Sequence, residues 1–325
     1  MEKSYLRYEL TDIDEIKLLN DILETNKDLK TLNLNFNKLG TNRSPLHITI
    51  NKIGSLFKTL ENNQTLTKLK LCQCMIHVPD LVKIFQLNTT LTVLILKRNN
   101  IGSDAVFIAD MLKTNQTLTT LSIQNNNIGN TVTSNLAYAL KRNTTLTKLS
   151  LNNNNIGDLG AHFLAETLKI NTSLKILYLK ECNIGSGGNY SISQALRINN
   201  TLTLLNLSTN YFSQYDLPYL ADALEVNKAL IKLDIKKMRF GDFGILSLVN
   251  ALKTNITLTE INVDFDHNNF LKEMLETNYI KKNNREKLCL QIVCLKKLNQ
   301  LGMIDKVKTL IPDIYASCMD KYTLV

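Results

Sequence analysis

Hydrophobic and polar residues alternate along this chain in a unit that occurs many times. In segment 143–157, which reads NTTLTKLSLNNNNIG, the apolar positions include Leu146, Leu149 and Leu151. The alternation around Leu149 and Leu151 predicts a short strand with these two side chains on one face and polar side chains on the other. Apolar residues in 160–168 then recur every three or four positions, which predicts a helix with one apolar stripe.

The same unit occurs nine times. Its first leucine falls at Leu29, Leu66, Leu91, Leu118, Leu146, Leu174, Leu202, Leu230 and Leu258. The last five steps between these leucines are 28 residues long, whereas the first three are 37, 25 and 27 residues long. A period of about 28 residues leaves room for a full helix after each strand. Because one short strand cannot bury its apolar face alone, the units are expected to stack into a curved solenoid.

The motif L-x-x-L-x-L-x-x-N-x-I, followed by Gly157, resembles the leucine-rich repeats of the ribonuclease-inhibitor type. Similar repeats form the receptor ends of cytosolic immune sensors and the activating proteins of the Ran GTPase. The resemblance covers roughly residues 26–277. It implies an α/β fold, a right-handed horseshoe-shaped solenoid with a parallel sheet on the concave side and helices on the convex side. Such a fold does not by itself define a function.

The two ends and the first repeat depart from the regular unit. Residues 1–25 carry an apolar set at helical spacing after Asp12 and Glu15, which resemble a capping box, and we interpret them as an N-terminal capping helix. The long first step contains an insertion around 41–47, which is either a tolerated loop or part of a binding surface. Residues 278–325 predict two helices that either cap the array of repeats or form a recognition tail.

Asparagines followed by x-Ser/Thr stand at one fixed position in seven repeats. They are Asn63, Asn88, Asn115, Asn143, Asn171, Asn199 and Asn255. This position lies where the helix ends and the next strand begins, so that glycans in every repeat would crowd the stack. We therefore predict that the Asn and its Thr or Ser partner cap the chain at the helix end instead of carrying glycans.

The cysteines indicate a reducing compartment. Cys74 and Cys182 occupy the slot of Asn154 in their own repeats and are interpreted as buried structural thiols, and no C-x-x-C pair occurs. The N-terminus lacks a basic segment followed by an apolar core, and no apolar run is long enough to span a membrane. We expect a monomeric protein of the cytoplasm without a membrane contact.

Motifs for catalysis are absent from the sequence. It contains no G-x-x-x-x-G-K-[ST], H-E-x-x-H or G-x-S-x-G pattern. Cys72, Cys74 and His77 lack an evident fourth ligand, which argues against zinc. Segment 185–188 (GSGG) is interpreted as a tight turn, with a phosphate cradle as the alternative. We expect no enzyme activity, no cofactor, no metal and no small-molecule substrate.

The outward strand positions would form a concave face with nine basic and four acidic residues. Exposed apolar side chains with charges around them are typical of protein-binding surfaces. The candidate contact residues are Lys68, Lys70, Val93, Ile95, Lys97, Arg98, Lys148, Ile176, Tyr178, Lys180, Leu204, Lys232 and Lys236. Many of the polar ones have an alternative role as solubilising residues. The pairs Val93/Ile95 and Ile176/Tyr178 do not, because apolar residues facing solvent lack a folding reason.

The favoured function is a non-catalytic protein–protein interaction scaffold that binds an acidic partner through the concave face. One hypothesis is an effector that an intracellular bacterium delivers into the host cytoplasm. A nucleic-acid-binding role is the alternative suggested by the net charge of +9 and the pI near 9.1, but the concave face offers few aromatic residues for base stacking. A regulator of a small GTPase would require a specific arginine, and nothing around Arg98 singles it out.

Overall fold

The computed structural model describes residues 5–7, 10, 13–37, 50–213, 215–238, 240 and 242–263. Within them, ten strands alternate with nine α-helices and one short 3₁₀ helix. The strands are β1 (Tyr5–Arg7), β2 (Thr31–Asn33), β3 (Lys68–Lys70), β4 (Val93–Ile95), β5 (Thr120–Ser122), β6 (Lys148–Ser150), β7 (Ile176–Tyr178), β8 (Leu204–Asn206), β9 (Lys232–Asp234) and β10 (Glu260–Asn262). The helices are α1 (Ile13–Thr25), α2 (Ile50–Asn62), α3 (Val78–Leu87), η1 (Gly102–Asp104), α4 (Ala105–Leu112), α5 (Asn130–Leu140), α6 (Gly157–Leu168), α7 (Ser186–Leu196), α8 (Leu217–Val226) and α9 (Asp242–Thr254).

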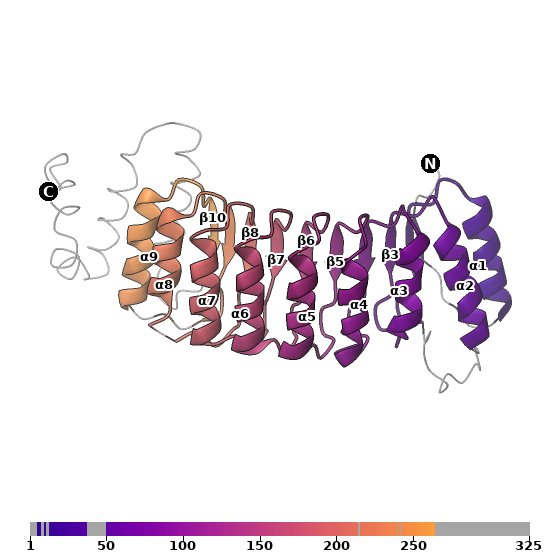
Figure 1. Ribbon diagram of the computed structural model, residues 1–325, viewed down its shortest axis with the longest axis horizontal. Helices are drawn as coiled ribbons and strands as arrows, with labels where there is room; N and C mark the ends of the chain where they lie inside the picture. Colours follow the sequence, from indigo (N-terminus) through magenta and orange to yellow (C-terminus); the bar gives the residue numbers. More distant parts are fainter. Residues whose placement is uncertain are drawn as a thin grey trace, which may run out of the picture.

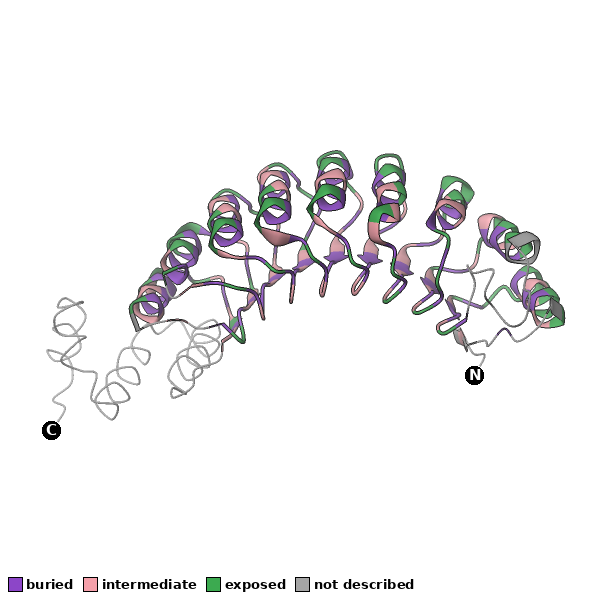
Figure 2. Cartoon of the chain, turned by 90° about the horizontal axis from the view of Figure 1, so that it is seen from below, coloured by how far each residue is buried: buried purple, intermediate pink, exposed green. Residues whose placement is uncertain are grey.

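The ten strands form one parallel sheet in the order of the chain. Equivalent residues of successive repeats are paired, so that Leu69 lies beside Leu94 and Leu94 beside Leu121. Figure 2 shows the described chain as an arch, with the strands along its inner side and the helices along its outer side. The helices follow one another along the arch in chain order (Figure 1). The predicted α/β solenoid, with a concave parallel sheet and convex helices, is confirmed.

Strand β1 is a feature that the sequence analysis missed, because it expected only a helix in residues 1–25. Tyr5–Arg7 pairs in parallel with β2, and Leu6 lies beside Leu32. The segment lacks the L-x-x-L-x-L pattern of the repeats, and its three residues give no periodic signal of their own. Its pairing covers the edge that β2 would otherwise expose. Helix α1 follows within the same N-terminal region.

The motif leucines form one continuous core. Leu146, Leu149 and Leu151 are fully buried, as are their equivalents in the neighbouring repeats. Helices α6 and α7 pack against the preceding turn through a glycine at the same repeat position. A Cβ added at Gly160 would lie 2.6 Å from the Ile156 side chain, and one at Gly188 would lie 2.5 Å from the Ile184 side chain. Glycine therefore allows an approach that any larger residue would prevent.

A layer of buried side chains joins the turns that follow the strands. Asn154 donates from Nδ2 to the carbonyl oxygen of Ile123 at 3.0 Å, and its Oδ1 accepts from the backbone N–H of Asn126 at 2.9 Å. Asn99, Asn126 and Asn210 make equivalent bonds to the repeats before them. Each amide thus satisfies backbone groups that the end of a strand leaves unpaired.

Two cysteines take the place of asparagine in this layer. The thiols of Cys74 and Cys182 lie 3.0 Å and 3.4 Å from the carbonyl oxygens of Leu34 and Leu151, and both residues are fully buried. Burial raises the pKa of each thiol to about 12. The interpretation of Cys74 and Cys182 as buried structural thiols is confirmed.

A second layer of asparagines lies where each helix meets the next strand. The Oδ1 of Asn143 accepts from the backbone N–H groups of Thr145 and Leu146, and its Nδ2 donates to the carbonyl oxygens of Leu112 and Asn115. Its equivalents are buried and bond to the preceding repeat in the same way, and they are Asn63, Asn88, Asn115, Asn171, Asn199, Asn227 and Asn255. Asn227 does so although Ala229 replaces the Thr partner. The capping role predicted for these asparagines is confirmed, and the capping hydrogen bonds are made by the side-chain amide of the Asn.

The turns also hold a residue in the left-handed backbone conformation, immediately before the buried Asn or Cys or, in the repeat of β9, before the buried Met238. Its φ lies between 53° and 71° at Phe36, Gln73, Arg98, Asn125, Asn153, Glu181, Thr209 and Lys237. None of these residues is glycine, which adopts this conformation most easily. Gly157, which the motif placed at a sharp turn, has a φ of 64°. The backbone of each turn is thus set by the stack around it.

Three expectations lie outside the described residues. They are the insertion around 41–47, the end of the ninth repeat after Val263, and the two C-terminal helices in 278–325.

Candidate functional site

The sheet arranges the thirteen candidate residues in parallel rows across the concave face. The first row holds Lys68, Val93, Lys148, Ile176, Leu204 and Lys232, with Thr120 between Val93 and Lys148. The second row holds Lys70, Ile95 and Tyr178, with Ser122 and Ser150 between the last two. Lys97, Lys180 and Lys236 follow their strands by two residues, and Arg98 is in the turn after β4. All are partly exposed except Arg98 and Lys236, which are exposed.

Two groups of apolar side chains result from this arrangement. Val93 and Ile95 lie together on β4, and Ile176 and Tyr178 lie on β7 with Leu204 beside Ile176. Strands β5 and β6 separate the two groups, and between them β5 presents Thr120 and Ser122 and β6 presents Lys148 and Ser150. The structure therefore brings the candidates into two apolar groups instead of one.

The outward positions from β2 to β6 and the turns after them form what we call the basic half. Its charged residues are Lys68, Lys70, Lys97, Arg98 and Lys148, and no acidic residue occupies an outward position there. Lys68 and Lys70 lie beside Val93 and Ile95 in the register of the sheet. Because adjacent strands are about 4.8 Å apart, these lysines flank the apolar pair directly.

The outward positions from β7 to β10, as far as the structure describes them, form what we call the paired half. Its acidic residues are all in contact with other groups of the concave face. Glu181 lies 3.4 Å from Lys180, and Glu260 forms an ion pair with Lys232. The hydrogen bond from Lys232 to Glu260 raises the pKa of that lysine above its usual value.

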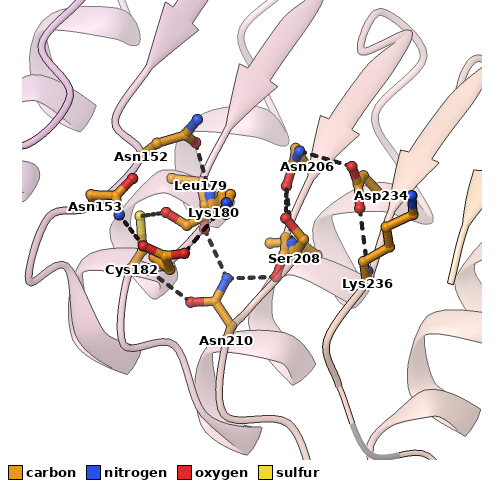
Figure 3. A network of polar contacts seen from close by, with 12 residues as sticks. Asn152, Asn153, Leu179, Lys180, Cys182, Asn206, Ser208, Asn210, Asp234 and Lys236 are labelled. Atoms are coloured by element: carbon orange, nitrogen blue, oxygen red, sulfur yellow. Dashed lines mark hydrogen bonds and ion pairs between the residues drawn. The ribbon is translucent and has the colours of Figure 1, made fainter. Parts of the chain in front are cut away.

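Asp234 is held in the network that Figure 3 shows. Its carboxylate accepts from Asn206 Nδ2 at 3.1 Å and from the backbone N–H of Lys236 at 3.2 Å. The paired half contains four basic residues, which are Lys180, Lys232, Lys236 and Lys237, and three described acidic residues, which are Glu181, Asp234 and Glu260. Its charge is nearly balanced, whereas that of the basic half is not.

Sequence reasoning missed this division of charge, although the period contains the signal. Lys232 and Glu260 are 28 residues apart, so aligning the repeats already places them side by side. It also missed the contact between the halves. The Lys148 ammonium lies 5.3 Å from the centre of the Tyr178 ring, a distance that allows a cation–π interaction.

The alternative sites for chemistry are filled by the protein's own groups. The Asp158 carboxylate accepts from the backbone N–H groups of Gly185 and Gly188 at 2.6 Å and 2.9 Å, so segment 185–188 already binds an anion of the preceding repeat. His77 Nδ1 lies 2.8 Å from an oxygen of Asp80. Among the described residues, no three His, Cys, Asp or Glu side chains are close enough together to hold a metal ion. Burial also raises the pKa of the Cys72 thiol.

Comparison with known families agrees with the geometry of the repeat. A family model described as "Leucine Rich repeat" matches residues 87–107, 114–131, 142–165 and 171–193, which contain strands β4 to β7. This protein is built of leucine-rich repeats. No curated protein matches the chain. Proteins of this repeat type serve as interaction scaffolds, which is the broad function that the match implies.

Several solved structures are similar to this leucine-rich repeat protein. The leucine-rich repeat-containing protein LegL7 from Legionella pneumophila is 17% identical, with 86% of this chain and 98% of that chain covered and a TM-score of 0.49. The actin-binding site 2 of leiomodin-1 is 22% identical over 55% of this chain and 95% of that chain, with a TM-score of 0.40. The tropomodulin C-terminal domain of Caenorhabditis elegans is 15% identical over 56% of this chain and 98% of that chain, also with a TM-score of 0.40.

No helix among the described residues combines the length and the apolar content that a membrane crossing requires.

Proposed function

We propose that this leucine-rich repeat protein is a non-catalytic scaffold that binds an acidic protein through its concave face. The supporting observation is the pattern of outward side chains. Val93, Ile95, Ile176, Tyr178 and Leu204 are partly exposed on the sheet and lie among lysines, although none of them is needed to fill the core. Apolar anchors within a charged surround are typical of protein interfaces, where the charges guide an oppositely charged partner.

The same face favours a protein over a nucleic acid. Among the described outward positions, the aromatic residues are Phe36 and Tyr178, which lie on different repeats. Sequence-tolerant binding of single strands relies on several aromatic platforms along a basic groove. Apolar Val93 and Ile95 at the centre of the basic half would instead contact phosphates unfavourably.

The proposal is tested by affinity capture from nuclease-treated cell extract with the full chain as bait. One variant combines Val93→Ala with Ile95→Ala, and a second combines Ile176→Ala with Tyr178→Ala. The matched control combines Tyr138→Ala with Leu159→Ala, two exposed apolar residues of helices α5 and α6 on the convex side. We expect wild type and control to retain the same proteins and both concave variants to lose them.

Two results would contradict the proposal. If nuclease treatment removes every bound protein, the chain binds nucleic acid. If the concave variants keep their fold by circular dichroism and still capture the wild-type set, the concave face is not the interface.

A further inference from the structure

Exposed aliphatic side chains gather along one edge of the arch, where each helix ends and the next strand begins. From α5 to α9 we call this the helix-end edge, and it consists of residues 141–147, 169–175, 197–203, 225–231 and 253–259. It contains every exposed isoleucine of the described residues and one exposed valine, which are Ile170, Ile198, Val226, Ile231 and Ile256. Their exposed fractions range from 42% for Ile231 to 81% for Ile256.

Folding does not require apolar residues at these places. Ile170, Ile198 and Val226 each stand immediately before a buried capping Asn. At the same place, Leu87 is also apolar, whereas the other repeats have the polar residues Thr25, Asn62, Thr114, Arg142 and Thr254. At the places of Ile231 and Ile256, all the other described repeats have polar residues. The aliphatic residues are therefore a property of this edge and not of the repeat.

The capping asparagines hold these side chains in a row. Asn171, next to Ile170, accepts from the backbone N–H of Leu174 at 2.8 Å and donates to the carbonyl oxygen of Leu140 at 2.7 Å. The asparagines after Ile198 and Val226 make equivalent bonds. Because helices α6, α7 and α8 stand side by side (Figure 1), the three side chains follow one another in steps of about 8–10 Å. Polar residues separate them, so each one stands alone.

The helix-end edge is also basic. It contains one acidic residue, Glu225, and seven basic residues, which are Lys141, Arg142, Lys169, Lys175, Arg197, Lys228 and Lys253. Lys169 pairs with Glu166 of the last helical turn, and cations at helix C-termini also complement the helix dipole. Folding therefore accounts for part of this charge. The net positive charge still attracts an anionic surface to the same edge that presents the aliphatic side chains.

We propose that the helix-end edge is a contact surface for an anionic lipid bilayer. Its aliphatic side chains enter the region between the headgroups, and its lysines and arginines contact anionic headgroups. A fluid lipid surface needs no complementary pockets, which suits side chains that stand alone. Protein interfaces instead concentrate their binding energy in packed aromatic and Arg residues, and the helix-end edge contains no aromatic residue. A second copy of the chain is disfavoured, because two such edges would repel each other.

This contact differs from a membrane crossing. The sequence analysis expected no membrane contact because no apolar run is long enough to span a bilayer, but a contact at the surface needs no such run. The helix-end edge is formed by the ends of helices and strands, whereas the concave face is formed along the strands (Figure 2). A bilayer on the edge therefore leaves the concave face open to a protein. The inference goes beyond the proposed function and does not depend on it.

The experiment measures co-sedimentation of the full chain with phosphatidylcholine vesicles that contain or lack phosphatidylserine. We expect the wild type to bind the vesicles with phosphatidylserine about tenfold or more tightly. Combining Ile170→Ser, Ile198→Ser and Val226→Ser should weaken that binding by about tenfold or more. The matched control combines Leu18→Ser, Phe107→Ser and Leu159→Ser, whose side chains are 52%, 40% and 53% exposed but lie outside the edge. It should change the binding by about twofold or less.

A second pair of variants compares the edge with the concave face at equal change of net charge. Arg142→Glu with Lys175→Glu and Lys228→Glu should weaken the binding by about tenfold or more. Lys68→Glu with Lys97→Glu and Lys236→Glu, on the concave face, should weaken it by about threefold or less, because salt screens distant charges. Circular dichroism checks that each variant is folded.

Three results would overturn the inference. They are no binding of the wild type to vesicles with phosphatidylserine, unchanged binding of the folded Ile170/Ile198/Val226 variant, and equal losses from the two charge variants. If vesicles are not bound and the Ile170/Ile198/Val226 variant instead loses proteins captured from extract, the edge binds a protein and not a bilayer. The proposed function is tested separately, because it depends on the concave variants of the capture experiment.

Discussion

The helix-end asparagines and the concave-face side chains recur with the same period, but the fold constrains them differently. Asn143 and its equivalents make the same hydrogen bonds in repeat after repeat, and each is buried. The first concave row instead changes from lysine to valine, threonine, lysine, isoleucine and leucine between β3 and β8. Where a position is uniform, burial explains the residue. Where it varies, folding leaves the choice open, so the residue there is free to serve solubility or the proposed binding.

The strongest test of this comparison is at the uniform position. Asn143→Ala removes the acceptor of two backbone N–H groups and the donor to two carbonyl oxygens, all in a buried setting. We expect it to lower the free energy of unfolding by about 3 kcal/mol, measured by urea denaturation with circular dichroism. Thr145→Ala is the matched control and should cost about 0.5 kcal/mol or less, because the hydroxyl makes only a 3.3 Å contact with Asn143 Oδ1. Equal losses of stability for Asn143→Ala and Thr145→Ala would show that both side chains together, and not the Asn143 amide alone, stabilise the repeat.

An intermediate effect of opposite sign is expected at Cys182. In the next repeat, the amide oxygen of Asn210 accepts a hydrogen bond from the backbone N–H of Cys182. The side chain of Cys182 has no amide oxygen and cannot accept in the same way from the preceding repeat. Cys182→Asn should therefore raise the free energy of unfolding by about 1 kcal/mol at neutral pH. A loss of stability would mean that the slot is too small for the amide in this repeat.

The gain from Cys182→Asn should grow in alkaline solution. In the wild type, the buried thiol has a pKa of about 12, against an ordinary value of 9.0. As the pH rises, the unfolded chain therefore loses this proton before the folded chain does. The contribution of the protonated Cys182 thiol to the free energy of unfolding is fully present below pH 9.0 and is lost as the pH rises toward 12. The difference between variant and wild type should increase by about 1.4 kcal/mol per pH unit in that window. Urea denaturation of both proteins at several alkaline pH values measures it.

The smallest effect on stability is expected on the concave face. Lys97 and Arg98 make no ion pair with a described acidic residue, and Arg98 is exposed. Lys97→Glu with Arg98→Glu should change the free energy of unfolding by about 0.5 kcal/mol or less, in the same urea assay. A larger loss of stability would show that Lys97 and Arg98 contribute to folding, and it would weaken the proposal that they serve binding.

The repeat period made most of the fold predictable. The spacing of Leu149 and Leu151 gave the inward face, and 28-residue steps gave the parallel order of the strands. Strand β1 could not be predicted, since three residues without a motif are defined only by pairing with β2. The candidate site was predictable as a set of outward positions. The division of this site into two apolar groups and into a basic half and a paired half was not predicted from the sequence. It depends on which repeats are neighbours and on the contacts that the side chains of Lys148, Glu181 and Asp234 make.

The left-handed residue in each turn has a consequence for how such a surface can diversify. Eight residues of seven different types, from Phe36 to Lys237, adopt nearly the same φ at the rim of the concave face. The backbone there is imposed by hydrogen bonds to the adjacent turn, such as that from the Arg98 N–H to the Gln124 carbonyl oxygen at 3.0 Å. An exchange of one rim residue for another therefore alters the chemistry offered at that point while the loop keeps its shape. New specificities can accumulate one repeat at a time, without redesign of the scaffold that carries them.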